Sequence, residues 1–235
     1  PYSEDGRIQG DPRSLLDPLT ALTYVAANTS KIRLGTGICL VPQRNPVYTA
    51  KQVADLDYLS GGRVDFGIGI GWLKEEFNAL GVPWTDRAGR TEECIGVMKT
   101  LWCDELSSFQ GKYFSFEAAY QNPKPVQRPH PPLIFGGESR AALKRVATLG
   151  QGWFTFNVTP ESLAQGIDIL QPLLEEQGRT ISDISISVTP DRQHINQESL
   201  KRFEELGAEQ IILPLFANNT DKLEGKATKY LELMQ

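Results

Sequence analysis

The sequence predicts an α/β protein of the TIM (βα)8 barrel type, and three observations lead to this fold class. Short apolar segments alternate with amphipathic helical segments, which is typical of parallel strands joined by helices. Two strand candidates carry glycine at alternate positions, so one face of each strand is bare. Their other faces are apolar, as expected where barrel strands meet the surrounding helices. A doubly wound open sheet is the alternative, but its central strands are covered on both faces.

Seven helices are predicted, and several have clear starting signals. A capping side chain stands directly before a proline at Asp17, Asn45 and Thr159, and proline is favoured at the first position of a helix. A glycine after the last turn ends several of these helices. The predicted helices cover residues 18–27, 46–59, 91–102, 139–149, 160–177, 197–206 and 221–233.

Six strands are predicted between the helices. They cover residues 32–42, 64–71, 132–137, 152–156, 183–189 and 210–216. Residues 107–116 are an exception, because they read as a small hairpin with Gly111 at its turn. A complete barrel needs further strands, and we expect the first one or two to precede Pro1. One domain over residues 1–235 is expected.

The composition indicates a protein that acts on a small molecule. The chain has 235 residues, of which 40% are hydrophobic and 23% charged, and a formal net charge of −5. No run of Lys and Arg points to nucleic acid, and no apolar run approaches the ~20 residues of a membrane span. The three cysteines are scattered, so reduced thiols and a cytosolic location are expected.

The most informative segment is VDFGIGIGW, residues 64–72. Its alternate positions are the glycines Gly67, Gly69 and Gly71. This strict alternation excludes a dinucleotide fingerprint, which needs its third glycine three residues after the second. The bare face either relieves crowding between converging strands or admits a ligand. Because Gly35 and Gly37 repeat the pattern on the neighbouring strand candidate, the ligand interpretation is favoured.

A further glycine signal lies where a strand runs into a helix. The segment reads Phe135-Gly136-Gly137-Glu138-Ser139. Free backbone N–H groups at a helix start, with no side chains in the way, can bind a phosphate. A plain tight turn with Ser139 as N-cap is the alternative.

Together these motifs make the sequence similar to the luciferase-like monooxygenase superfamily, particularly to its probable oxidoreductases that use the deazaflavin coenzyme F420. The matching text is KIRLGTGICLVPQRNPVYTAKQVADLDYLSGGRVDFGIGIGWLKEEFNALGVPW, then RTEE, then PPLIFGGESRAALKRVATLGQGWF. Several spaced motifs occur in family order between about residues 16 and 154.

The resemblance implies a cofactor at the C-terminal mouth of a βα barrel. It implies a cis peptide at Gly37-Ile38 beneath the ring, contacts along the ring and ribityl chain, and a phosphate at the glycine turn. The implied cofactor-binding residues are Thr36, Gly37, Ile38, Ile70, Gly71, Trp72, Gly136, Gly137, Glu138 and Ser139. The expected activity is hydride transfer between F420 and a small organic substrate, in a homodimer.

Two other activities stay open. One is an FMN-dependent monooxygenase that activates dioxygen, and the other is a flavin-binding protein without catalysis. Many deazaflavin-using relatives have a histidine near the end of the second strand, and that segment has no counterpart here. His130 and His194 do not match the motif, so no catalytic acid or base is assigned.

Some further residues have two interpretations each. Arg140 and Lys144 either contact an anionic cofactor tail or lie on a solvated helix face. Arg87 and Arg90 either reach substrate or phosphate or form a surface pair near acidic neighbours.

Overall fold

The computed structural model of the chain describes residues 16–233. The chain divides into two compact units, with the division after Pro132. The two units are described one after the other, each by itself.

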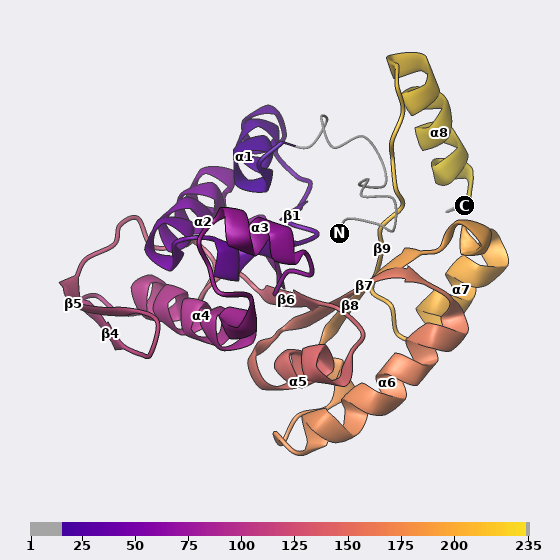
Figure 1. Cartoon of the computed structure of the whole chain (residues 1–235). Helices are drawn as coiled ribbons and strands as arrows, with labels where there is room; N and C mark the ends of the chain where they lie inside the picture. Colours follow the sequence, from indigo (N-terminus) through magenta and orange to yellow (C-terminus); the bar gives the residue numbers. More distant parts are fainter. Residues whose placement is uncertain (1–15, 234–235) are drawn as a thin grey trace. The chain divides into compact units, whose positions relative to one another are not determined.

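Among its described residues, 16–132, the first unit contains parallel strands, four α-helices and a hairpin (Figure 1). Strands β1 and β2 both pair in parallel with β3, and β4 pairs with β5 in antiparallel fashion. Its helices are α1 (Pro18–Asn28), α2 (Pro46–Ser60), α3 (Lys74–Ala79) and α4 (Arg87–Cys103). Its strands are β1 (Leu34–Gly35), β2 (Cys39–Leu40), β3 (Val64–Gly69), β4 (Ser107–Gln110) and β5 (Ser115–Ala119).

Local capping explains where the first two helices begin. The Asp17 carboxylate accepts a 3.0 Å hydrogen bond from the backbone N–H of Thr20 at the start of α1. The Asn45 side chain accepts hydrogen bonds from Val47 N and Tyr48 N at the start of α2. Each cap satisfies N–H groups that have no partner inside the helix.

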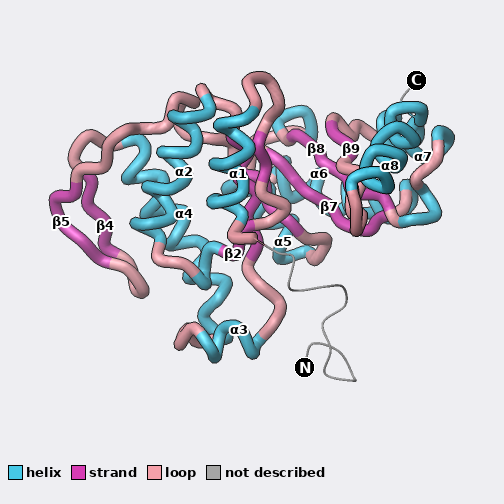
Figure 2. The backbone as a smooth tube through the Cα atoms, turned by 90° about the horizontal axis from the view of Figure 1, so that it is seen from above, coloured by secondary structure: helices cyan, strands magenta, loops and turns pink. Residues whose placement is uncertain are grey.

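The core of this unit lies between β3 and the two long helices α2 and α4, which run side by side (Figure 2). Phe66 of β3 and Trp102 of α4 are fully buried and meet edge to face, with 6.3 Å between ring centroids. The indole N–H of Trp102 donates to the carbonyl oxygen of Ala50 over 2.8 Å, which joins α4 to α2. The apolar face predicted for residues 64–72 is therefore confirmed at Val64, Phe66 and Ile68, which are buried, but not at Trp72, which is exposed.

The Glu93 carboxylate of α4 holds the turn of the hairpin β4–β5, and the Ser107 hydroxyl of β4 also donates to Thr100 O of α4. Glu93 accepts hydrogen bonds from the backbone N–H groups of Lys112, Tyr113 and Phe114, at 2.7, 2.8 and 3.2 Å. The predicted hairpin is confirmed, and its second strand continues to Ala119.

The second unit is a parallel sheet in the order β6-β7-β8-β9, with helices between the strands (Figure 1). Its strands are β6 (Leu133–Gly136), β7 (Gly152–Val158), β8 (Ser185–Pro190) and β9 (Gln210–Ile211). Its helices are α5 (Arg140–Leu149), α6 (Pro160–Glu175), α7 (Gln197–Glu205) and α8 (Thr220–Leu233). Because the strands are parallel, their carboxyl ends share one edge of the sheet. Loops at that edge carry ligand sites in α/β folds.

The structure corrects several boundaries. The strand predicted over 32–42 is two pairs of residues, β1 and β2, separated by residues 36–38. The helix predicted from residue 91 begins at Arg87, and helix α3 was not predicted at all. Strand β3 ends at Gly69, so residues 70–72 lie beyond its carboxyl end.

Within residues 16–233, no helix is long and apolar enough to cross a membrane.

Candidate functional site

In the first unit, three of the predicted cofactor-binding residues, Thr36, Gly37 and Ile38, lie between β1 and β2. The Gly37-Ile38 peptide bond is cis, as the family resemblance implies. Thr36 is 8% exposed, and its hydroxyl donates to the carbonyl oxygen of Gly67 over 2.7 Å. The Thr36 hydroxyl is therefore used within the protein, whereas Gly37 is exposed and Ile38 half-buried.

The bare face of β3 does not open onto an empty space at its first two glycines. A Cβ atom on Gly67 would lie 1.8 Å from the carbonyl oxygen of Thr36, and one on Gly69 would lie 1.9 Å from Cδ1 of Ile38. The neighbouring segment thus fills the room that these glycines leave. At Gly67 and Gly69 the ligand interpretation is wrong, and close approach of two strands explains both residues.

Ile70, Gly71 and Trp72 follow the carboxyl end of β3. Gly71 has a φ of +81°, a conformation that favours glycine. A Cβ on Gly71 would lie 2.6 Å from the Phe77 ring. Trp72, which the family resemblance implies as a cofactor-binding residue, has a side chain that is 70% exposed. A large exposed aromatic side chain at a strand's carboxyl end can cover a planar ligand.

In the second unit, the predicted phosphate turn joins β6 to α5. Gly137 has a φ of +110°, and its carbonyl oxygen accepts a 3.0 Å hydrogen bond from the Trp153 indole. Ser139 is the N-cap of α5, and its hydroxyl accepts from Ala142 N over 3.2 Å. The Glu138 carboxylate accepts from Phe156 N over 3.2 Å, so it is held toward the end of β7.

This turn has the donors that a phosphate requires. Within residues 16–233, no hydrogen-bond acceptor lies on the backbone N–H of Arg140 or Ala141. Both N–H groups belong to the first turn of a ten-residue helix, where the helix dipole favours an anion. The side chains of Arg140 and Lys144 are exposed on the same helix. These residues fit the phosphate of a flavin or deazaflavin.

Arg87 and Arg90 lie at the start of α4 against aromatic rings. The Arg87 guanidinium lies 3.7 Å from the centroid of the Trp84 ring and donates to Trp84 O. The Arg90 guanidinium lies 4.8 Å from the centroid of the Phe114 ring. Both guanidinium groups therefore lie over aromatic rings, and a contact of either one with substrate or phosphate stays a prediction.

The carboxyl ends of β7 and β8 carry a feature that sequence analysis missed. Asp191 follows β8 directly, and its carboxylate lies 2.7 Å from Nδ1 of His194. Close by on β7, Phe154 is buried while Phe156 is 66% exposed. An acidic residue one turn before a histidine, just after a buried strand, is the signal that could have revealed this pair.

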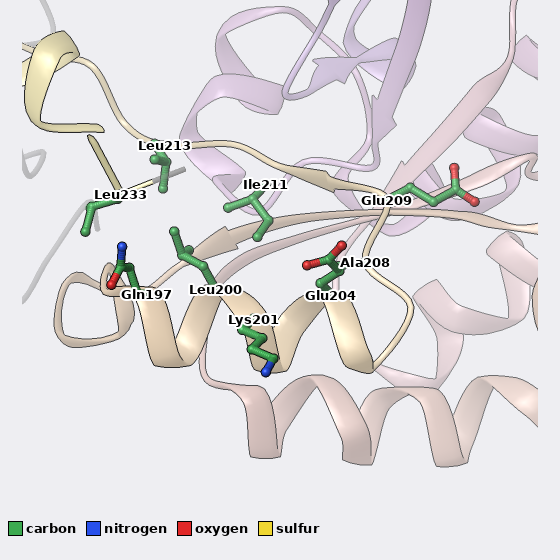
Figure 3. Close-up of a pocket in the computed structure, with 9 residues that line it drawn as sticks. All are labelled: Gln197, Leu200, Lys201, Glu204, Ala208, Glu209, Ile211, Leu213 and Leu233. Atoms are coloured by element: carbon green, nitrogen blue, oxygen red, sulfur yellow. The ribbon is translucent and has the colours of Figure 1, made fainter. Parts of the chain in front are cut away.

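A pocket of about 470 Å³ lies elsewhere in the second unit, between α7, β9 and the end of α8 (Figure 3). It is lined by Gln197, Leu200, Lys201, Glu204, Ala208, Glu209, Ile211, Leu213 and Leu233. None of the predicted cofactor-binding residues lines this pocket. Among the described residues, no group of three or more His, Cys, Asp or Glu side chains could hold a metal ion.

The predicted residues thus form two sets. Six of them lie around the cis peptide and the carboxyl end of β3, and the other four form the turn between β6 and α5. Each set lies within one unit, and the contact of all ten residues with a cofactor stays a prediction.

Comparison with known proteins identifies the family. The model of the luciferase-like monooxygenase family matches residues 4–214. The chain is 32% identical over 224 residues to the uncharacterized protein Rv0953c of Mycobacterium tuberculosis, covering 92% of this chain and 74% of that protein. It is 34% identical over 168 residues to an FMNH2-dependent dimethylsulfone monooxygenase of Pseudomonas putida, covering 70% of this chain and 46% of that protein.

A solved structure shows the same fold. An F420-dependent secondary alcohol dehydrogenase, in complex with an F420–acetone adduct, superimposes with a TM-score of 0.78 at 19% identity, covering 94% of this chain and 84% of that one. The predicted TIM-type α/β class is confirmed by this likeness. With a family model spanning most of its length, the chain belongs to the luciferase-like monooxygenase family.

Proposed function

We propose that this protein is an oxidoreductase that transfers a hydride between coenzyme F420 and a small organic substrate. The observation that carries the proposal is the turn between β6 and α5. Its positive-φ glycine, its serine cap and its two backbone N–H groups, which have no acceptor among residues 16–233, suit a phosphate group. When bound, a deazaflavin supplies the hydride chemistry, so the protein has to orient the reactants and exclude water.

The first unit supports the proposal through the end of β3. The exposed indole of Trp72 and the exposed backbone at Gly37 can line the faces of a planar ring.

In the second unit, the side chains of Arg140 and Lys144 lie four residues apart on α5 and can attract an anionic tail beyond the phosphate.

A second candidate is an FMN-dependent monooxygenase, which the 34% identity to a dimethylsulfone monooxygenase favours. Reduced FMN can activate dioxygen, whereas a deazaflavin lacks the ring nitrogen that supports this route. The bound cofactor therefore decides the reaction class.

A titration of the purified protein with F420 and with FMN, followed by absorbance and fluorescence, tests the proposal. Tighter binding of F420, with oxidation of reduced F420 by an organic acceptor, supports hydride transfer. Tighter binding of FMN, with substrate-dependent uptake of dioxygen, supports the monooxygenase. Binding without turnover of either reduced cofactor points to a flavin-binding protein, and no binding of either one overturns all three activities.

A further inference from the structure

Asp191 and His194 form a hydrogen-bonded pair at the carboxyl end of β8. The Asp191 carboxylate oxygen Oδ1 lies 2.7 Å from Nδ1 of the imidazole. The same oxygen accepts from the backbone N–H groups of Gln193 and His194, at 2.9 and 3.0 Å. The carboxylate is thereby fixed in place, and it fixes the imidazole in turn.

The pair lies on the same sheet edge as the phosphate turn. Asp191 N donates to Val158 O over 3.0 Å, which ties the end of β8 to the end of β7. Phe156 N donates to the Glu138 carboxylate, which ties the end of β7 to the turn after β6. Neighbouring strands lie about 4.8 Å apart, so the pair is two strands, or about 10 Å, from the phosphate turn.

The pair has the chemistry of a proton donor and acceptor. A carboxylate can only accept at Nδ1, so Nδ1 carries a proton and Nε2 is the atom that exchanges one. Within residues 16–233, Nε2 has no hydrogen-bond partner. The side chains of His194 and Asp191 are 28% and 23% exposed, so both are partly shielded from water. The hydrogen bond from His194 holds the pKa of Asp191 below its ordinary value, which keeps this carboxylate anionic at neutral pH.

We propose that His194, oriented by Asp191, exchanges a proton with the oxygen atom of a carbonyl or alcohol substrate. This inference rests on the proposed hydride-transfer function. In the reducing direction, a reduced deazaflavin would supply a hydride to the carbonyl carbon when bound, and the C=O π pair would move to oxygen. That oxygen takes the proton from Nε2 of the imidazolium, which leaves an alcohol and a neutral imidazole. Water then returns a proton to Nε2, and every step runs backwards for alcohol oxidation.

Other charged groups also face the imidazole. Glu161, in the first turn of α6, interacts electrostatically with His194 and lies 3.6 Å from Arg202 of α7. Asp191 and Glu161 are thus the carboxylates near His194, and Arg202 partly neutralises the second one. A test of pH dependence has to include Glu161→Gln, because this carboxylate also acts on the imidazole.

The experiment compares His194→Gln, Asp191→Asn and Asp191→Glu with the wild type and with His130→Gln. His130 is the other histidine of the chain, and it lies in the loop before β6 against the Trp102 ring. Oxidation of reduced F420 is followed with acetone, cyclohexanone and benzaldehyde as carbonyl probes across a range of pH. The affinity for F420 is measured separately. Imidazole ¹H and ¹⁵N NMR of the ligand-free protein reports the protonation of both histidines.

We expect His194→Gln to lower kcat at least 100-fold, the lower end for general acid catalysis, with the F420 affinity within twofold of wild type. General acid catalysis predicts that the wild-type rate declines at high pH, and this decline should disappear in His194→Gln. Asp191→Asn should lower kcat about tenfold and remove the protonated Nδ1 signal from the NMR spectrum. Asp191→Glu should retain part of the kcat and part of the protonated Nδ1 signal that Asp191→Asn loses. His130→Gln should behave as wild type, and Glu161→Gln should move the pH profile without removing the decline.

Several results would overturn the inference. A kcat of His194→Gln within threefold of wild type would do so, as would an equal loss in His130→Gln. So would wild-type protein that binds F420 and reduces none of the three carbonyl probes, which leaves the cofactor proposal standing. Protein that binds neither F420 nor FMN would overturn the proposed function as well.

Discussion

The hydroxyl of Thr36 donates to the carbonyl oxygen of Gly67, and the carbonyl oxygen of Thr36 occupies the space where a Cβ of residue 67 would be. This double contact explains why glycine stands at position 67 of a strand whose opposite face is tightly packed. The requirement is set by a segment about 30 residues earlier in the chain, which runs alongside β3 between β1 and β2.

Gly67→Ala should therefore destabilise the protein severely. A Cβ at this position would lie 1.8 Å from backbone rather than from a flexible side chain, so the strands have to separate. We expect a loss of about 3 kcal/mol in the free energy of unfolding, at the upper end of overpacking effects. Gly35→Ala is the matched control, because its nearest neighbour would lie at 3.8 Å. The free energies of unfolding of both variants are measured with urea. Equal values for Gly67→Ala and Gly35→Ala would contradict the close approach of Thr36 O to position 67 as the reason for the glycine.

The same contact shows where sequence analysis succeeded and where it could not. The caps at Asp17, Asn45 and Thr159 act within one helical turn, so the helix starts that they predict are confirmed. The filling of the space beside Gly67 depends on residues remote in sequence. Alternation alone could not distinguish a neighbouring segment that fills this space from a ligand. The single strand predicted over 32–42 was wrong because that segment, residues 36–38, interrupts it.

Trp72 offers a cleaner test of the ring site than Gly71. Substituting Gly71 would strain a residue at φ +81° and push against Phe77, so a loss of binding would be confounded with a loss of fold. The Trp72 side chain is 70% exposed, and Trp72→Ala should change the free energy of unfolding by less than about 0.5 kcal/mol. The Kd for F420 or FMN should rise about tenfold, equivalent to about 1.4 kcal/mol. Tyr24→Ala, 74% exposed on α1, is the control for both measurements, and an unchanged Kd in Trp72→Ala would remove Trp72 from the site.

The basic pair on α5 should distinguish between cofactors. Arg140 and Lys144 are exposed on the helix that follows the phosphate turn. If they attract a long anionic tail, Arg140→Glu combined with Lys144→Glu should weaken F420 with a polyglutamate tail more than FMN. The difference should shrink at high salt, because screening weakens exposed charges. Equal losses for the two cofactors at low salt would show that the pair does not contact a tail.

The three thiols should differ sharply in reactivity. Burial raises the pKa of Cys39 to about 11 and that of Cys94 to about 12, so neither is a thiolate at neutral pH. Burial also raises the pKa of Cys103, but this residue is exposed on the last turn of α4. A thiol reagent at pH 8 should modify one cysteine per native chain, with mass spectrometry locating it at Cys103, and all three after unfolding. Rapid labelling of Cys94 in the native protein would contradict the packing of α4.

Cys103 also illustrates what composition can and cannot establish. Three scattered cysteines predicted free thiols, and all three are free. Cys39 is buried on β2, and Cys94 is buried on α4 with Trp102, whereas Cys103 is exposed at the end of α4. The pair Asp191–His194 was overlooked for a related reason. In the sequence, an Asp or a His in a loop is usually a solvated side chain. The two can be recognised as a pair once β8 is known to end at Pro190, because Asp191 then follows the strand directly.

The carboxylate of Glu93 should make the stability of the hairpin depend on pH. Burial tends to raise the pKa of Glu93, but hydrogen bonds from Tyr113, Lys112 and Phe114 outweigh it, so the pKa lies below the ordinary value of 4.5. A carboxyl group whose pKa is lower in the folded state stabilises the protein above its unfolded pKa, and that contribution is lost as the pH falls through the folded pKa.

Glu93→Gln should therefore cost stability at pH 7 and much less at pH 3. A neutral amide accepts the three N–H groups more weakly, and we expect a loss of about 1–2 kcal/mol at pH 7, reduced by the partial exposure of the site. The measurement is urea unfolding of both proteins at the two pH values. Ser108→Ala, an exposed position on β4, controls for general effects on the hairpin. A stability difference as large at pH 3 as at pH 7 would mean that the shape of the side chain, and not its charge, holds the hairpin on α4.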